Sequence, residues 1–235
     1  MRIAIISDIH SNLEALTKAL EIIDTKNVDE IVCLGDIVGY GANPNECVEL
    51  VRKRAKYVVM GNHDYAVAVD PTELYYFSSY ARESDIWTRE VLTKENLDFL
   101  KSLPFTVSFK NLLFVHSSPA QPKEWEYIFT EAQAKVQFHY FKEKICFIGH
   151  SHFPGIFPEN GYYNGKLDRN TRYIINVGSI GQPRDGDWRL CFGIFDLDKW
   201  TYEEIRSEYD VERASIKIIQ NGLPEFLARR ILVGR

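Results

Sequence analysis

The chain has 235 residues, long enough for one sizeable domain with its own core, and 45% of them are apolar and 26% charged. This balance is ordinary for a globular protein, and the formal net charge of −5 argues against non-specific binding to nucleic acid or an anionic membrane. No stretch approaches the roughly 20 apolar residues that cross a bilayer, and the N-terminal apolar run is too short for a signal peptide. We therefore expect a single domain over residues 1–235 and no membrane partner.

The cysteines are scattered along the chain, at Cys33, Cys47, Cys146 and Cys191, and form no C-x-x-C pair. Three of them lie in apolar runs that predict strands, which favours buried thiols over disulfides. These features fit a cytoplasmic protein.

The N-terminal quarter of the chain alternates between short apolar runs and helical patterns. Helices are predicted from Asn12 and from Asn43, where a capping residue or a first-turn proline opens the pattern. The apolar runs Arg2–Ser7, Glu30–Leu34 and Tyr57–Met60 predict strands. This β-α-β-α-β order predicts parallel strands with helices on their faces.

The rest of the chain is richer in strands. Residues Pro71–Lys101, Glu131–Phe141 and Val211–Arg235 read as helical. The predicted strands lie closer together here, so some of them should pair antiparallel. They are Thr106–Phe109, Leu112–Val115, Ile145–Ile148, Tyr173–Val177 and Leu190–Leu197. We predict an α/β fold (α+β by some schemes), a four-layer α-β-β-α sandwich of two mixed sheets flanked by helices.

Five of the six histidines occur in short polar segments that directly follow apolar strands. The segments are S-D-I-H, G-N-H-D, V-H-S-S and G-H-S-H, and G-D-I-V-G-Y-G is a further segment of this kind. Ligands of open α/β sheets gather at the carboxyl ends of strands. The polar residues delivered there are Asp8, His10, Asp36, Asn62, His63, His116, His150 and His152. Only His139 lies elsewhere, on a predicted helix, and we assign it no role.

This set of side chains fits two divalent cations. Imidazole suits Zn, Fe, Ni and Mn, and carboxylate and amide oxygens favour harder ions. Two cations roughly 3.5–4 Å apart require one bridging carboxylate. Each segment alone has an ordinary explanation: D-x-H arises by chance, G-D marks a turn, and a lone His116 serves structure as readily as a metal. Their occurrence together, all after strands, favours the metal site.

In this order the segments resemble the motifs of the calcineurin-like metallophosphoesterase superfamily, and Asn176–Asp187 resembles a group of its small prokaryotic phosphodiesterases or phosphatases. The resemblance implies two metal sites joined by Asp36. His63 would face the leaving group without binding metal. The first metal would be held by Asp8, His10 and His152, and the second by Asn62, His116 and His150, the last through its imidazole or a neighbouring backbone oxygen.

The expected chemistry follows from charge. Water shared by two cations drops from a pKa of 15.7 towards roughly 7, so that a metal-bound hydroxide exists at neutral pH and can attack phosphorus. The cations neutralise the phosphate oxygens, and His63 donates a proton to the leaving oxygen. The two metals would be Mn, Fe, Zn or Ni.

One segment departs from the protein-phosphatase branch of the family, which reads G-D-x-V-D-R-G. Gly39 and Tyr40 stand where that branch has an Asp that orients the catalytic histidine and an Arg that grips phosphate. Asp64 could compensate in part for the missing Asp. Arg184, on a glycine-rich loop, either reaches the substrate or pairs with Asp185 or Asp187 at the surface. The aromatic stretch Leu74–Tyr80 is more often core than a substrate contact.

The leading hypothesis is a metal-dependent phosphodiesterase or phosphatase acting on small or nucleotide-like phosphate esters. The alternatives are hydrolysis of dinucleoside polyphosphates, which requires basic residues along a cleft, protein dephosphorylation, and a non-catalytic phosphate-binding module. A nuclease or a stable nucleic-acid partner is less compatible with the acidic charge and the lack of a Lys/Arg run.

Overall fold

The computed structural model describes all residues, 1–235, and its first sheet confirms the predicted parallel opening. The strand order is β10-β9-β1-β2-β3. The first three strands along the chain run parallel, and β9 and β10 are added antiparallel at the other edge. The strands are β1 (Arg2–Ile6), β2 (Glu30–Cys33), β3 (Tyr57–Val58), β9 (Leu190–Asp196) and β10 (Thr201–Ser207).

The second sheet has the order β4-β5-β6-β8-β7. Its centre is parallel, because β5, β6 and β8 run the same way, and each edge strand pairs antiparallel with its neighbour. Both sheets are therefore mixed, as predicted. The strands are β4 (Thr106–Phe109), β5 (Leu112–Val115), β6 (Ile145–Ile148), β7 (Gly155–Pro158) and β8 (Tyr173–Asn176).

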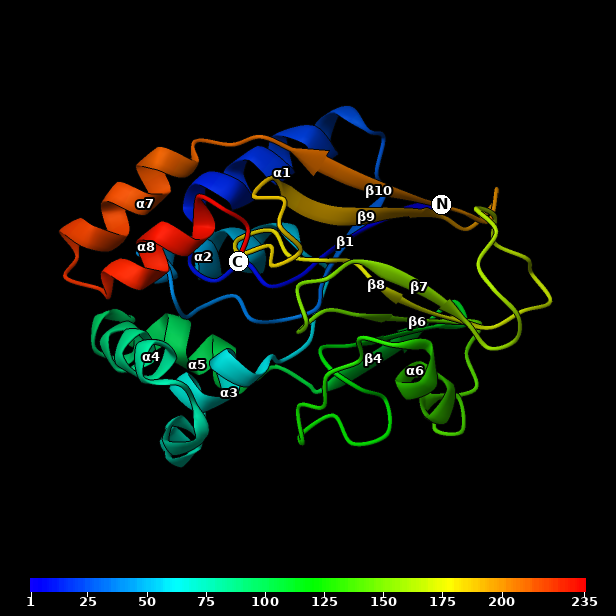
Figure 1. Ribbon diagram of the computed structural model, residues 1–235, viewed down its shortest axis with the longest axis horizontal. Helices are drawn as coiled ribbons and strands as arrows, with labels where there is room; N and C mark the ends of the chain where they lie inside the picture. The colour runs from blue at the N-terminus through cyan, green and yellow to red at the C-terminus, as the bar shows by residue number, and fades with distance from the viewer.

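Helices cover the outer faces of the two sheets. Figure 1 shows α1 at the top of the view and α6 at the bottom, with the strands between them. No helix is long and apolar enough to cross a membrane. The helices are α1 (Leu13–Thr25), α2 (Pro44–Arg54), α3 (Asn62–Ala68), the 3₁₀ turn η1 (Pro71–Tyr76), α4 (Ser79–Val91), α5 (Lys94–Lys101), α6 (Glu131–Gln137), α7 (Val211–Gln220) and α8 (Glu225–Ile231).

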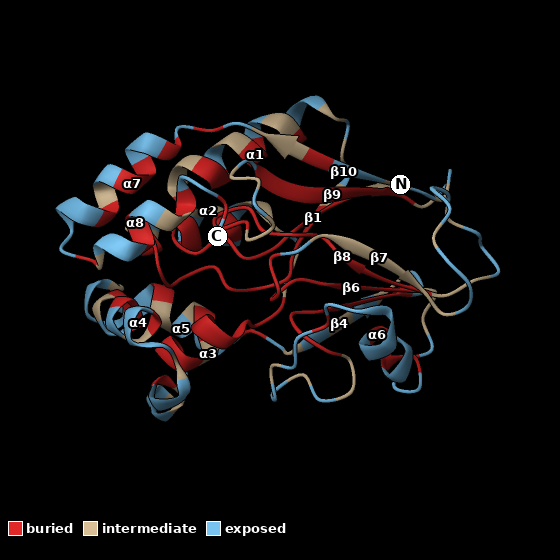
Figure 2. Ribbon diagram, in the orientation of Figure 1, coloured by how far each residue is buried: buried red, intermediate tan, exposed pale blue.

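Alternation along the central strands produces the four layers. Successive side chains of a strand point to opposite faces. In β1, Ile3 and Ile5 join the core between the sheets, whereas Ala4 and Ile6 pack against the helices of the first sheet. In β6, Phe147 faces the other sheet and its neighbours face α6. Both faces of these strands are buried (Figure 2), which explains their continuous apolar runs.

Three elements differ from the sequence prediction. β10 reads T-Y-E-E-I-R-S and lies at a sheet edge with most of its residues exposed or half-buried, so it lacks an apolar run. β7 is an edge strand bounded by Gly155 and Pro158, which are strand-breaking residues. α3 begins inside the G-N-H-D segment, for which we predicted a polar segment after a strand and no helix. The four cysteines are buried and unpaired, as expected.

Candidate metal centre

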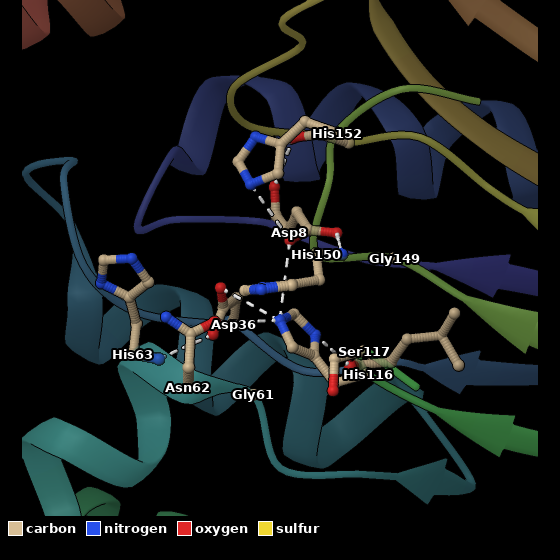
Figure 3. A network of polar contacts seen from close by, with 12 residues as sticks. Asp8, Asp36, Gly61, Asn62, His63, His116, Ser117, Gly149, His150 and His152 are labelled. Atoms are coloured by element: carbon tan, nitrogen blue, oxygen red, sulfur yellow. Dashed lines mark hydrogen bonds and ion pairs between the residues drawn. The ribbon is translucent and has the colours of Figure 1, made fainter. Parts of the chain in front are cut away.

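The polar segments that follow the strands converge at one edge of the sandwich (Figure 3). The first sheet contributes Asp8 and His10 after β1 and Asp36 after β2. The second sheet contributes His116 after β5, and His150 and His152 after β6, while Asn62 is the first residue of α3. All of these side chains are buried, and Asn62, at 9%, is the most exposed of them. Residues far apart in sequence therefore share one small volume because parallel strands end on the same side.

The first group of side chains contains Asp8, His10, Asp36 and His152, with potential ligand atoms all within 4.8 Å of one another. The Nε2 atoms of His10 and His152 lie 3.1 Å apart. Asp8 Oδ1 lies 3.2 Å from His152 Nε2, and Asp36 Oδ2 lies 3.7 Å from His10 Nε2. Two imidazole nitrogens and two carboxylates thus point at one centre.

The second group contains Asp36, His116 and His150, again within 4.8 Å. Asp36 Oδ2 lies 3.3 Å from His116 Nε2, and Asn62 Oδ1 lies 3.2 Å from the same nitrogen. Asp36 belongs to both groups, so its carboxylate stands between them. Of the two possibilities left open for His150, its imidazole is the part that enters this group.

The backbone fixes the orientation of all four histidine rings. The nitrogen of each ring that points away from the centre lies 2.5–3.2 Å from a main-chain carbonyl, to which it donates its proton. In a neutral ring the nitrogen that faces the centre then carries a lone pair, as in metal-binding histidines. Asp8 Oδ1 is buried without a hydrogen-bond partner. The carbonyls belong to Val38 for His10, Leu34 for His116, Trp125 for His150 and Gln182 for His152.

An unpartnered carboxylate oxygen beside converging lone pairs is the arrangement expected of a cation site. The residues present therefore fit divalent metal ions.

Burial keeps most of these histidine rings neutral, which is the protonation state that metal binding requires. Burial lowers the pKa of His150 to about 3, so the ring is neutral, and burial also lowers the pKa of His10 and His152. Burial alone would lower the pKa of His116 too, but the neighbouring Asp36 outweighs it and raises that pKa to about 9. Binding of a cation there must release this proton.

The segments that carry the candidate ligands adopt left-handed backbone conformations. The φ angles are 54° at Asp8, 49° at His10, 49° at Asp36, 64° at His150 and 62° at His152. Such values are uncommon for residues other than glycine and persist only where the surrounding structure enforces them. Their concentration in these segments marks the site.

His63 lies beside the two groups but belongs to neither. Its main-chain N–H donates to Asp36 Oδ1 over 2.9 Å, and its ring packs 4.5 Å from the ring of Tyr40. The Nδ1 atom lies 2.7 Å from Asp85 Oδ2, a buried carboxylate of α4. Burial alone would lower the pKa of His63, but Asp85, Tyr40 and Asp36 outweigh it and raise that pKa well above its usual value. These neighbours therefore favour the protonated form of the ring.

The carboxylate that contacts this histidine is Asp85 rather than Asp64. The segment with Gly39 does lack a carboxylate, but the ring has one from another element. A Cβ on Gly39 would lie 2.6 Å from His63 Nδ1 and 2.7 Å from Asp85 Oδ1, so glycine is required here. Asp64 does not contact the ring through any hydrogen bond. Its carboxylate accepts the main-chain N–H groups of Ile37, Val38 and Gly61, and so ties two of the polar segments together.

A cleft of about 720 Å³ opens above these residues. Arg184 lines this cleft. It does not pair with Asp185 or Asp187 at the surface, because those carboxylates pair with Arg206 and Arg189. The guanidinium of Arg184 donates to Gln182 Oε1 and lies 3.4 Å from the hydroxyl of Tyr40. Cleft-lining residues include Asp36, Asn62, His63, His150, His152 and Arg184.

The aromatic stretch divides between the two roles that the sequence left open. Leu74 is buried and belongs to the core. Tyr76 and Phe77 line the cleft, and the Phe77 ring lies 4.8 Å from the ring of His63. Tyr75, which is 77% exposed, does not line the cleft.

The sequence analysis missed Asp85, Trp125 and Arg230, which also surround the cleft or the histidines. Trp125 and Arg230 lie in segments with no motif. Asp85 had a weak signal, because Ala81, Ser84, Asp85 and Thr88 are the buried face of α4, at helical spacing. Charged residues are rarely buried without a partner, so an acidic residue on such a face indicates one.

Comparison with known proteins gives the family of this chain. A model of the calcineurin-like phosphoesterase superfamily domain matches residues 1–199. The uncharacterized protein MJ0912 of Methanocaldococcus jannaschii is 46% identical over 99% of this chain and 98% of its own. A metallophosphoesterase from Sphaerobacter thermophilus superposes with a TM-score of 0.87 at 40% identity, over 100% of this chain and 99% of the other. The hypothetical protein PH1004 of Pyrococcus horikoshii gives 0.86 at 22% identity, over 100% and 98%. The chain belongs to the calcineurin-like phosphoesterase superfamily.

Proposed function

We propose that this protein is a phosphoesterase that hydrolyses phosphodiester or phosphomonoester bonds with two divalent cations. The observation that carries the proposal is the position of Asp36, whose carboxylate is common to both groups of candidate ligands. A shared carboxylate is what two neighbouring cations require. Asp8, His10 and His152 would hold one cation, Asn62, His116 and His150 the other, and Asp36 would join them. A non-catalytic phosphate-binding module has no need of so complete a ligand set.

The residues around the cations would have separate roles in the reaction. When bound, two divalent cations supply acidified water and positive charge beside the phosphate oxygens. His63 holds a proton at the edge of the cleft and donates it to the leaving oxygen. Asp85 keeps the His63 ring in place by accepting the Nδ1 proton, which leaves Nε2 for the substrate. The Asn62 side chain lies between His116 and the cleft and is placed to contact the phosphate.

The positions of Arg184 and of the Gly39–Tyr40 segment bear on the class of substrate. The segment with Gly39 and Tyr40 lacks an arginine, and Arg184 enters the cleft from another loop instead. Arginine binds phosphate oxygens in a fork geometry and gains more from a monoester dianion than from a diester monoanion. We propose small or nucleotide-like phosphate esters as substrates, among which Arg184 would favour monoesters while diester hydrolysis stays detectable. We expect protein dephosphorylation to be poor, because Gly39 and Tyr40 depart from the protein-phosphatase motif.

The experiment combines metal analysis with two rates. The purified protein is reconstituted in turn with Mn, Fe, Zn and Ni, its metal content is measured by elemental analysis, and hydrolysis of p-nitrophenyl phosphate and bis(p-nitrophenyl) phosphate is followed. We expect about two ions per chain and measurable cleavage of the diester. A protein that binds a single ion with full activity contradicts the two-metal proposal. A fully loaded protein that cleaves neither compound contradicts the catalytic one, and efficient cleavage of phosphoproteins with no diester activity contradicts the substrate class.

A further inference from the structure

Two arginines from distant parts of the chain enter the same cleft. Arg184 lies on the loop after β8, and Arg230 lies on α8, the last helix. Their guanidinium carbons lie 5.8 Å and 5.7 Å from the centre of the Tyr40 ring. Tyr40 in turn packs 4.7 Å from His10, so this arginine pair lies next to the metal-binding groups without belonging to them.

Neither arginine pairs with the side chain of an Asp or Glu residue. Their neighbours in sequence do: Asp185 and Asp187 bind Arg206 and Arg189, and Arg229 pairs with Glu225 one turn earlier in α8. Two like charges in a partly buried cleft are unfavourable without a counter-ion. Burial and the neighbouring Arg184 accordingly lower the pKa of Arg230 to about 10. An anion between the two side chains would relieve this repulsion.

Protein contacts hold the Arg230 side chain in place. Its Nε donates to the main-chain oxygen of Arg235 over 2.5 Å, and its guanidinium lies 5.4 Å from the ring of Phe226. Phe226 stacks on Tyr80 of α4 at 4.6 Å, which fixes this end of α8 against the other side of the cleft. The terminal nitrogens of Arg230 form no hydrogen bond to protein. They are donors without acceptors at the cleft surface.

We infer that Arg230 extends the phosphate site beyond Arg184 into a second anion subsite, which binds a phosphoryl group attached to the one that is hydrolysed. This inference rests on the proposed function and gives it a substrate class: phosphate esters with a second phosphoryl group, as in the esters of nucleoside diphosphates. Guanidinium groups suit phosphate because their N–H donors match its oxygens. The aromatic residues at the cleft, Tyr76 and Phe77, provide apolar surface for the organic part of such a substrate.

The test compares two inhibitors that differ by one phosphoryl group, AMP and ADP. Inhibition constants against bis(p-nitrophenyl) phosphate hydrolysis are measured with the metal-loaded wild type and with Arg230→Gln, Arg230→Lys and Arg229→Ala. We expect the wild type to bind ADP at least about tenfold more tightly than AMP. Arg230→Gln should lose most of this preference by weakening ADP alone, and Arg230→Lys should keep part of it. Arg229→Ala, on the exposed face of the same helix, should match the wild type.

Several results would overturn the inference. An equal loss for AMP and ADP in Arg230→Gln means that Arg230 contacts the hydrolysed phosphate or only supports the fold. A wild type without a preference for ADP means that no second subsite exists. Calorimetric titration of the same metal-loaded proteins with AMP and ADP separates this question from the proposed function. If the wild type has no hydrolytic activity, the calorimetric preference still confirms or refutes the subsite.

Discussion

The candidate metal centre and the rim of the cleft are built in different ways. Every candidate ligand of the centre except Asn62 directly follows a strand, and all of them are buried. The rim instead takes Arg184 from a loop, Arg230 from the last helix and Tyr76 from a 3₁₀ turn. Sheet register fixes the first set relative to one another, whereas the second set depends on how loops and helices dock. The centre therefore suits a chemistry that requires fixed distances, and the rim suits a choice among substrates.

The largest effect is expected at the residue that both groups share. Asp36→Asn should lower the content of both metals and reduce turnover by roughly 10³-fold or more, because positive charge at the phosphate contributes several kcal/mol. Metal analysis and rates on bis(p-nitrophenyl) phosphate measure this. The control is Asp98→Asn, an exposed carboxylate of α5. Full metal content and full rate in Asp36→Asn would show that this carboxylate does not bridge two cations.

His63 should behave differently from the ligands that surround it. His63→Gln should reduce turnover by roughly 10²–10⁴-fold, which is the usual contribution of a positioned acid, while metal content stays unchanged. The loss should be smaller for esters with good leaving groups such as nitrophenol. Metal analysis of the variant decides the comparison, since a lost ion would make His63 a ligand rather than a proton donor.

Asp85 should set the pH range over which His63 can donate its proton. His63 is active as an acid when protonated, so turnover is present below its pKa and is lost as pH rises through it. The Asp85 carboxylate raises that pKa. Asp85→Asn should therefore move the alkaline limb of kcat to lower pH and reduce turnover by about tenfold at neutral pH. Glu83→Gln, on the exposed side of the same helix, is the control. An unchanged alkaline limb would separate Asp85 from the titration of His63.

Substitution at the rim should have the smallest effect and the greatest dependence on substrate. Arg184→Ala should raise the KM for p-nitrophenyl phosphate by about tenfold. The KM for the bis(p-nitrophenyl) diester should rise by less, because the monoester carries one more negative charge. Metal content should be that of the wild type. Equal behaviour of wild type and variant on both compounds would place Arg184 outside the substrate site.

The difference between residues at strand ends and residues on loops or helices also explains what the sequence could predict. Strand-end residues such as Asp8 and His116 could be found because an apolar run followed by a polar ligand is a local pattern. β5 and β6 were predicted with their observed bounds for the same reason, since both are buried on two faces. Arg230 and Asp85 could not be placed, because they meet the cleft only after helices α8 and α4 have docked. β10 escaped prediction because its edge position leaves polar residues exposed on the strand.

The position of Asp85 makes the His63 ring dependent on a separate helix. A carboxylate at position 39 would lie on the same stretch of chain as Asp36, next to the His63 ring. Here the space that Gly39 leaves empty is filled from α4, whose other contacts include Tyr80 stacked on Phe226 of α8. Any movement that lifts α4 would free the imidazole while leaving the strand-borne ligands in place. A displaced α4 would thus take the Asp85 carboxylate away from His63 in a molecule whose candidate metal ligands stay in place.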